Sequence, residues 1–273
     1  MTGSKKPPLP LQSKVSDEVI ARPQAKRRLT KLLTERKPLK GEKPAPTLWL
    51  TAEASPFILH ILAREEGTLR DLDRFLRDVW MECCGHMSLF QYRAKNERTI
   101  IYTADPEPEW DDEDDPFLED LPPEAREHYL NMTRNRFPLE KPLTTKLSGA
   151  FAGDVSLRYE YDMGTTTYVQ LKVIKRLETA WPAKNQVRLI ARNVRPEWKC
   201  RECGEAATRL CTMNECWEDG YAKFCATHAK THPKQAHPRE GGDWMMAPLS
   251  NSPRDPCCGY AEGPKDEEPY VWR

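Results

Sequence analysis

The sequence predicts an α+β fold in which a mainly antiparallel sheet packs against one principal amphipathic helix, followed by a small cysteine-rich module. Three features of the chain predict this fold. Apolar side chains alternate on both sides of a turn at Gly164, a capped helix follows Thr68, and cysteines and histidines gather between Cys200 and His237. Strands that flank a single strong helix are typical of a two-layer α+β domain.

The first 46 residues form a basic region that we expect to be partly disordered. Residues 1–45 contain 12 Lys and Arg against 4 Asp and Glu, and residues 1–14 are polar and rich in proline. Such a composition cannot bury a core. A basic helix is predicted over residues 23–36, because Pro23 suits a first helical turn and leucines recur on one face.

The predicted α+β domain spans residues 47–196. Two apolar runs, residues 48–50 and 57–63, predict its first strands, and further strands are expected near residues 91–95 and 98–103. The second run is almost wholly apolar, which is typical of a strand buried on both faces.

The principal helix begins after Thr68. Thr68 is the expected N-cap, and Asp71 lies three residues later, as in a capping box. Asp73 and Arg77 are spaced to pair on the solvent side of the helix, and Gly85 is expected to end it. The predicted buried face contains Leu69, Leu72, Leu76, Val79 and Trp80.

The second half of the domain begins with an acidic loop. Residues 105–127 contain 12 Asp and Glu and a single Arg. A short helix is expected over residues 124–134. Strict alternation of apolar residues predicts a hairpin of residues 155–161 and 169–173, and residues 187–191 predict a last strand.

The cysteine-rich module, residues 197–240, contains eight ligand-type side chains in four close pairs. The CxxC and CxxH spacings form short loops whose N–H groups can face a thiolate, and Zn²⁺ in a structural site takes four Cys or His ligands. Because alternating pairs usually cross over, first with third and second with fourth, we predict two zinc ions. The first set is Cys200, Cys203, Cys225 and His228, and the second is Cys211, Cys216, His232 and His237.

The module needs such ions because it contains few large aliphatic residues. Structural zinc supplies on the order of 10 kcal/mol of apparent folding free energy. The spacing resembles that of cross-braced B-box and MYND-type zinc modules. A simple ribbon with one ion and spare histidines is the alternative, and reduced cysteines buried as small apolar side chains are another. Residues 241–273 are interpreted as a C-terminal tail.

Several stretches resemble the plasmid pRiA4b Orf-3-like family. They are residues 68–90, with Trp80 and the run from Cys83 to Phe90, and residues 159–164 on the hairpin. The ending, residues 251–254 and 258–260, resembles a subgroup with a cysteine-rich C-terminal module. The resemblance covers about residues 47–260 and implies an α+β fold in a bacterial or archaeal protein.

The resemblance also implies an association with plasmids or insertion sequences, but it implies no particular reaction. The chain departs from the commoner family pattern after Gly164. Many members have an acidic residue followed by Trp and His there, whereas this chain has Thr165, Thr166 and Thr167. A polar site that depends on that acid and histidine is therefore not expected.

A third metal site is a further candidate outside the module. It would combine Cys83, Cys84 and His86 with Cys257 or Cys258 from the tail. The alternative is that these cysteines end the helix and pack into the core.

Catalysis has weaker sequence support. His60, Glu160 and Asp162 are acid/base candidates, but Glu160 is expected to point to solvent and Asp162 to serve the turn. The chain has no phosphate loop, GxSxG or HExxH pattern. Closed zinc sites also leave no position for a reactive water.

Composition limits the possible classes and cellular locations of the protein. The net charge is zero, there is no apolar run of about 20 residues, and residues 1–10 lack the apolar core of a signal peptide. Nine cysteines in such a chain indicate metal ligands in a reducing cytoplasm.

We therefore predict a cytoplasmic, zinc-binding and non-catalytic binding or scaffold protein whose module contacts a protein partner. One alternative is a nucleic-acid-binding accessory protein of a mobile element that uses residues 22–37. The module itself, with seven basic and five acidic residues from Lys199 to Arg239, is a poor phosphate binder. An enzyme of unknown reaction is the third class.

Overall fold

The computed structural model describes residues 30–31, 41–93, 98–107, 118, 121–136, 138–181, 186–216, 222–239, 242–255 and 257–260. Of the predicted basic helix, only Thr30 and Lys31 are described, and both are helical. The rest of that prediction, and most of the acidic loop, lie outside the described residues.

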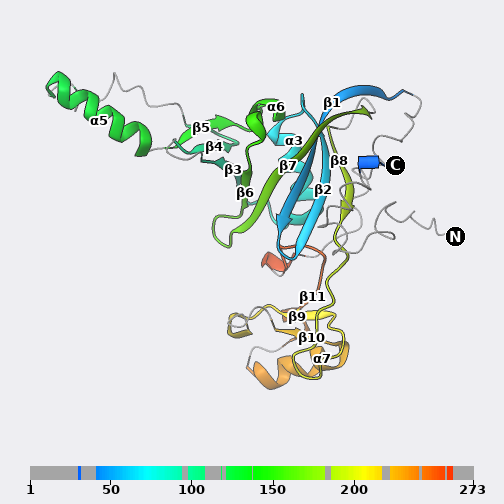
Figure 1. Ribbon diagram of the computed structural model, residues 1–273. Coiled ribbons are helices and arrows are strands. Elements are labelled where there is room, and N and C mark those ends of the chain that lie inside the picture. Colours follow the sequence, from blue (N-terminus) through cyan, green and yellow to red (C-terminus); the bar gives the residue numbers. More distant parts are fainter. Residues whose placement is uncertain are drawn as a thin grey trace.

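An eight-stranded sheet forms the body of the protein (Figure 1). Its strands are β1 (Lys43–Ala54), β2 (Phe57–Arg64), β3 (Ser88–Tyr92), β4 (Ile100–Thr103), β5 (Leu139–Pro142), β6 (Leu157–Tyr161), β7 (Thr167–Trp181) and β8 (Val187–Arg192). Their order is β5-β4-β3-β6-β7-β1-β2-β8. The sheet is mixed, because β4 and β5 run parallel while the other neighbours run antiparallel. Together with the helices described next, this sheet confirms the α+β class.

The α-helices of the described residues are α3 (Leu69–Leu76), α5 (Pro123–Arg136), α6 (Leu147–Ala150) and α7 (Ala226–Ala236). The expectation of one principal helix is not confirmed, since α5 is longer than α3 and projects away from the sheet in Figure 1. In the described part of the chain, every helix is too short or too polar to cross a bilayer.

Helix α3 starts as the capping box predicts. The Thr68 hydroxyl accepts the backbone N–H of Asp71 at 3.3 Å, and the Asp71 carboxylate accepts the N–H of Thr68 at 2.8 Å. The helix continues as one π-helical turn, Arg77–Met81. The apolar positions predicted to face the core are buried, so this face closes one side of the sheet.

The almost wholly apolar run of β2 has a direct cause in the packing. Leu59 and Ile61 join the core under α3, whereas Leu62 packs on the opposite face with Trp49 and Trp181. Apolar side chains are therefore needed on both sides of this strand, as is typical of an interior position.

The predicted Asp73–Arg77 pair forms at 2.9 Å, but its placement toward solvent is wrong. Asp73 is 8% exposed, and its carboxylate also accepts the hydroxyls of Ser88 at 2.6 Å and Tyr159 at 2.8 Å. Arg77 in turn donates to the His86 carbonyl at 2.8 Å. The pair thus fixes the loop that follows the helix.

The predicted hairpin is confirmed by the pairing of β6 with β7. Asp162 occupies its turn with a φ of +65° and accepts the N–H of Gly164 at 3.0 Å. The expected exposure of Glu160 is wrong, since the residue is buried on β6, which lies between β3 and β7 in the sheet. The Glu160 carboxylate is covered there by Gln91 and paired with Arg158 at 2.7 Å.

The cysteine-rich module lies below the main sheet in Figure 1. It contains a three-stranded sheet in the order β10-β9-β11, and α7 packs beside it. The strands are β9 (Arg209–Cys211), β10 (Lys223–Phe224) and β11 (Met246–Pro248). Strand β11 comes from residues that the sequence interpretation assigned to the tail, so the chain passes through the module twice.

After β11 the chain returns to the sheet domain. The Asn251 amide exchanges hydrogen bonds with Asn193, where the chain first leaves β8, at 2.7 and 3.1 Å. The Ser252 hydroxyl donates to the Trp80 carbonyl at the end of the helical segment at 2.7 Å. These side chains are buried, so the module is anchored to the domain by both of its connections.

We predict that Asp73→Ala lowers the free energy of unfolding by about 2–3 kcal/mol, because it leaves the Tyr159 hydroxyl and the Arg77 guanidinium without their shared acceptor. Urea unfolding followed by tryptophan fluorescence measures the change. Arg74→Ala, at an exposed position of the same helix, is the control and should change stability by less than about 0.5 kcal/mol. Equal losses for the two variants would contradict a structural role for the Asp73 carboxylate.

Candidate metal centres

The first Cys/His set of the module joins a turn to the start of α7. Cys200 and Cys203 flank the turn, and Cys225 and His228 lie at the start of the helix. The separation is 3.8 Å between the Cys203 and Cys225 sulfurs, and 3.5 and 3.4 Å from the Cys200 and Cys225 sulfurs to His228 Nδ1. All four ligand atoms lie within 4.8 Å of one another.

The second set joins the middle of the module to the end of α7. Cys211 lies in β9, Cys216 ends a 3-10 turn, and His232 and His237 come from the helix and the residue after it. The Cys216 sulfur lies 3.4 Å from Nε2 of each histidine, and the Cys211 sulfur lies 3.7 Å from His237 Nε2. The structure therefore groups the eight side chains into two interleaved sets that share α7.

These separations equal the edges of a tetrahedron around one ion. Zn–S bonds of about 2.3 Å and Zn–N bonds of about 2.05 Å give edges of about 3.8 Å between two sulfurs and about 3.6 Å between sulfur and nitrogen. Each set can therefore hold one four-coordinate metal ion with little movement. With four protein ligands, each such site is closed.

The backbone around the first set helps two of its three thiols to ionise, whereas burial and the neighbouring thiols of Cys200 and Cys225 raise the pKa of Cys203 to about 11. Burial opposes ionisation of Cys200, but the backbone N–H groups of Cys225, Cys203 and Glu202 lower its pKa to about 6. The backbone N–H of His228 likewise lowers the pKa of Cys225. Hydrogen bonds to the Cys225 and Cys200 sulfurs raise the pKa of His228. Binding of a divalent cation would favour the deprotonated forms of these ligands together.

In the second set, the pKa of Cys216 moves in the opposite direction from that of Cys200. Burial and the neighbouring Cys211 thiol raise the pKa of Cys216 to about 11. Crowded thiols oppose each other's ionisation, so binding of a divalent cation is the means by which they become thiolates together. The apolar core of the module consists largely of these same cysteines with Phe224, Met245 and Met246.

A third cluster lies at the domain, where the sequence allowed either Cys257 or Cys258 to complete it. The structure brings Cys83, Cys84, His86 and Cys258 together, within 4.8 Å of one another, and leaves Cys257 outside the cluster. Cys258 reaches the domain because the chain returns past Ser252.

The acid/base candidates do not form a site. His60 lies in β2 and Glu160 in β6, and β1 and β7 separate these strands in the sheet. His60 Nδ1 accepts the Trp49 indole N–H at 3.2 Å. Asp162 pairs instead with the buried guanidinium of Arg254. The Asn-Ser-Pro-Arg run of residues 251–254 was the sequence signal for this contact, although its role was not predicted.

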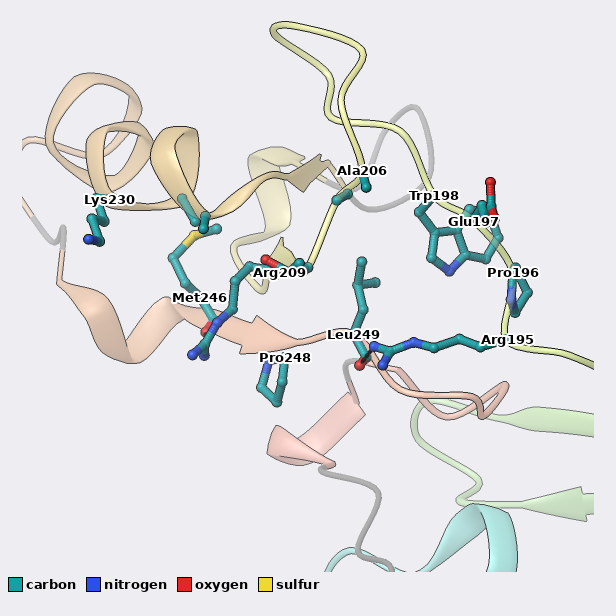
Figure 2. A pocket seen from close by; sticks show the side chains of 14 residues that line it. Arg195, Pro196, Glu197, Trp198, Ala206, Arg209, Lys230, Met246, Pro248 and Leu249 are labelled. Atoms are coloured by element: carbon teal, nitrogen blue, oxygen red, sulfur yellow. Dashed lines mark hydrogen bonds between the residues drawn. The ribbon is translucent and has the colours of Figure 1, made fainter. Parts of the chain in front are cut away.

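Sequence reasoning also missed a groove of about 900 Å³ where the module meets the connecting chain (Figure 2). Clefts that bind ligands have volumes of roughly 300–1,000 Å³. The Lys223 ammonium nitrogen lies 4.5 Å from the centre of the Trp198 ring, a cation–π contact that stabilises the Trp198 side of the groove. The lining of this module groove includes Arg195, Glu197, Trp198, Arg209, Lys230, Met246, Pro248 and Leu249.

Comparison with known proteins adds little about function. No protein-family model matches the chain, and no curated protein matches it either. Among solved structures, it is similar to a protein of unknown function, MM3350, from Methanosarcina mazei Go1. The identity is 17%, the TM-score is 0.37, and the match covers 54% of this chain and 68% of that one. The resemblance to the pRiA4b Orf-3-like family stays a prediction.

We predict that strong chelation unfolds the module and spares the sheet domain, because the described core of the module consists largely of ligand cysteines, whereas that of the domain is aliphatic and aromatic. Hydrogen exchange with mass spectrometry, on the full chain with and without 1,10-phenanthroline, should show loss of protection in β9, β10 and α7. Amides of β1 and β2 serve as the internal control and should keep their protection. Unchanged exchange in α7 would contradict a metal-dependent module.

Proposed function

We propose that the protein is a zinc-binding, non-catalytic docking protein whose module presents the module groove to a protein partner. The observation that carries the proposal is the pair of closed, interleaved Cys/His sets. Each offers four ligands, so no position is left for a water or a substrate. Ions held in this way stabilise a surface rather than perform a reaction.

The ligand chemistry favours zinc. Mixed sulfur and imidazole ligands in a tetrahedron suit Zn²⁺, whereas iron–sulfur clusters are usually held by cysteines alone. The separations quoted above also fit the bond lengths of zinc. We propose one ion in each set, which gives two ions in the module.

The module groove depends on these ions for its shape. Its walls come from α7, from β9 and β11, and from the connecting chain at residues 195–198 (Figure 2). Helix α7 carries ligands of both sets, and β9 carries Cys211. Loss of either ion would therefore move a wall of the groove.

The lining indicates what kind of partner fits. Arg195, Arg209 and Lys230 bring three positive charges to the rim, against one negative charge from Glu197. Trp198 and Pro248 add apolar surface between the charged side chains. We propose that the occupant is a segment of another protein that combines carboxylates with an apolar side chain. Charge pairs of this kind set specificity and association rate.

Nucleic-acid binding through residues 22–37 stays a prediction, because only Thr30 and Lys31 of that segment are described. Association with a mobile element and a place in the cytoplasm are likewise parts of the proposal. They rest on the family resemblance and on composition.

We predict that the full zinc-loaded chain selects acidic peptides with apolar residues from an arrayed peptide library. The double variant Arg209→Glu, Lys230→Glu should lose at least tenfold in affinity for those peptides, because the rim changes sign. Fluorescence anisotropy on the best peptides measures this change.

Lys146→Glu with Lys175→Glu is the matched control, since it changes the same charge at exposed positions outside the groove. The affinity of this control variant for the selected peptides should stay within twofold of that of the unmodified chain. Equal losses in both double variants would show only a nonspecific charge effect and would contradict the groove as the binding site. Preference for DNA or RNA over every peptide would also overturn the proposal.

A further inference from the structure

Cys83, Cys84, His86 and Cys258 form a cluster that joins two parts of the chain that are far apart in sequence. The first three residues follow the helical segment that ends at Met81, and Cys258 lies 172 residues after His86. We propose that this cluster binds a third zinc ion, which clamps the returning C-terminal segment onto the sheet domain. This site is separate from the module and from its groove.

The distances fit one four-coordinate ion. The Cys83 and Cys84 sulfurs are 3.7 Å apart, close to the edge of about 3.8 Å for two sulfurs on one zinc ion. His86 Nε2 lies 3.3 Å from the Cys258 sulfur and 2.9 Å from the Cys84 sulfur. The latter separation would lengthen by about 0.7 Å to reach the edge expected between sulfur and nitrogen. A small rotation of the exposed Cys84 side chain provides that change.

The histidine has the orientation of a metal ligand. His86 Nε2 faces the sulfurs, while Nδ1 lies 3.6 Å from the Asp162 carboxylate on the other side of the ring. Metal-bound histidines usually donate their second N–H to a carboxylate, and a shift of roughly 0.5 Å would bring the Asp162 oxygen within hydrogen-bond distance of Nδ1. Asp162 is itself held in the hairpin turn by the N–H of Gly164.

The charge around the cluster is also suited to thiolates. Three thiolates and a neutral imidazole around Zn²⁺ carry a net charge of −1. The Arg254 guanidinium, whose side chain is fully buried, directs Nη2 toward the sulfurs of Cys83 at 3.7 Å and Cys258 at 3.9 Å. Donors of this kind around the ligands stabilise the deprotonated sulfurs.

Cys83 packs against the main core, but simple core packing does not account for the other two cysteines. Cys84 and Cys258 are exposed, so neither fills apolar space. Cys258 also has a φ of +52°, a left-handed conformation that is unfavourable for a residue with a side chain. A bond from its sulfur to a metal ion would offset that cost and explain why the chain bends there.

The site has a mechanical consequence. The chain leaves the domain at Asn193 and returns at Asn251, and the third ion would fasten the segment that continues beyond that second anchor. Loss of the ion should loosen residues 250–260. The sheet and the two module sites should stay intact, because the module ligands lie between Cys200 and His237 and the sheet has its own apolar core.

Zinc content of the full chain tests the site. The protein is purified reduced and without chelator, and bound ions are counted by native mass spectrometry and by plasma mass spectrometry. We expect three ions in the unmodified chain, two in Cys258→Ser and three in Cys257→Ser, the matched control from the adjacent residue. Cys84→Ser, at an exposed position, is a second variant that should also hold two ions.

Hydrogen exchange gives a readout beyond the count. Residues 250–260 should exchange faster in Cys258→Ser than in Cys257→Ser, with no change in α7. Two ions in the unmodified chain and no loss in Cys258→Ser would overturn the third site. That outcome would leave the module proposal standing, whereas loss of an ion on Cys211→Ser tests the module alone.

Discussion

The convergence of four Cys/His side chains at each of two points is the constraint on which the proposed account of the module depends. Its strands are two or three residues long, and its buried side chains are largely the cysteines themselves with Phe224, Met245 and Met246. So small an apolar core cannot hold α7 against β9 and β10. With one ion in each of the two interleaved Cys/His sets, as proposed, both ends of α7 would be held to the turns around it. In the proposed account the shape of the module groove depends on metal coordination, because two of its walls, α7 and β9, carry ligand side chains.

Buried polar contacts play the corresponding part at the domain. Asp73 and Arg77 hold the loop after the helical segment, and Asn193 and Asn251 join the two connections of the module. Arg254 reaches the hairpin turn through Asp162 and the Thr165 carbonyl. The place of the module relative to the sheet thus depends on side chains in four distant parts of the sequence. A partner in the groove would act on a surface that is fixed from both ends.

Local patterns were enough to predict most elements. The capping box at Thr68, the apolar face of α3 and the alternation along β6 and β7 depend on neighbours within a few residues. The grouping of eight module ligands followed from their spacing. Asp73 and Glu160 were misplaced, because their burial depends on strands β3 and β6, which are paired through long-range contacts. The same limit applies to the Arg254 contacts, to the choice of Cys258 over Cys257 and to the module groove. Each depends on the path of the chain after β11, which a local sequence pattern does not predict.

Zinc K-edge X-ray absorption on the full chain, purified without chelator, tests the central claim most directly, because it reports the ligands of every bound ion together. Closed Cys/His sites predict four-coordinate zinc with sulfur at about 2.3 Å and nitrogen at about 2.0–2.1 Å, and no oxygen ligand. A spectrum that requires five or six light-atom ligands would mean an open or adventitious ion. Protein that is folded in the module yet free of zinc would contradict the account altogether.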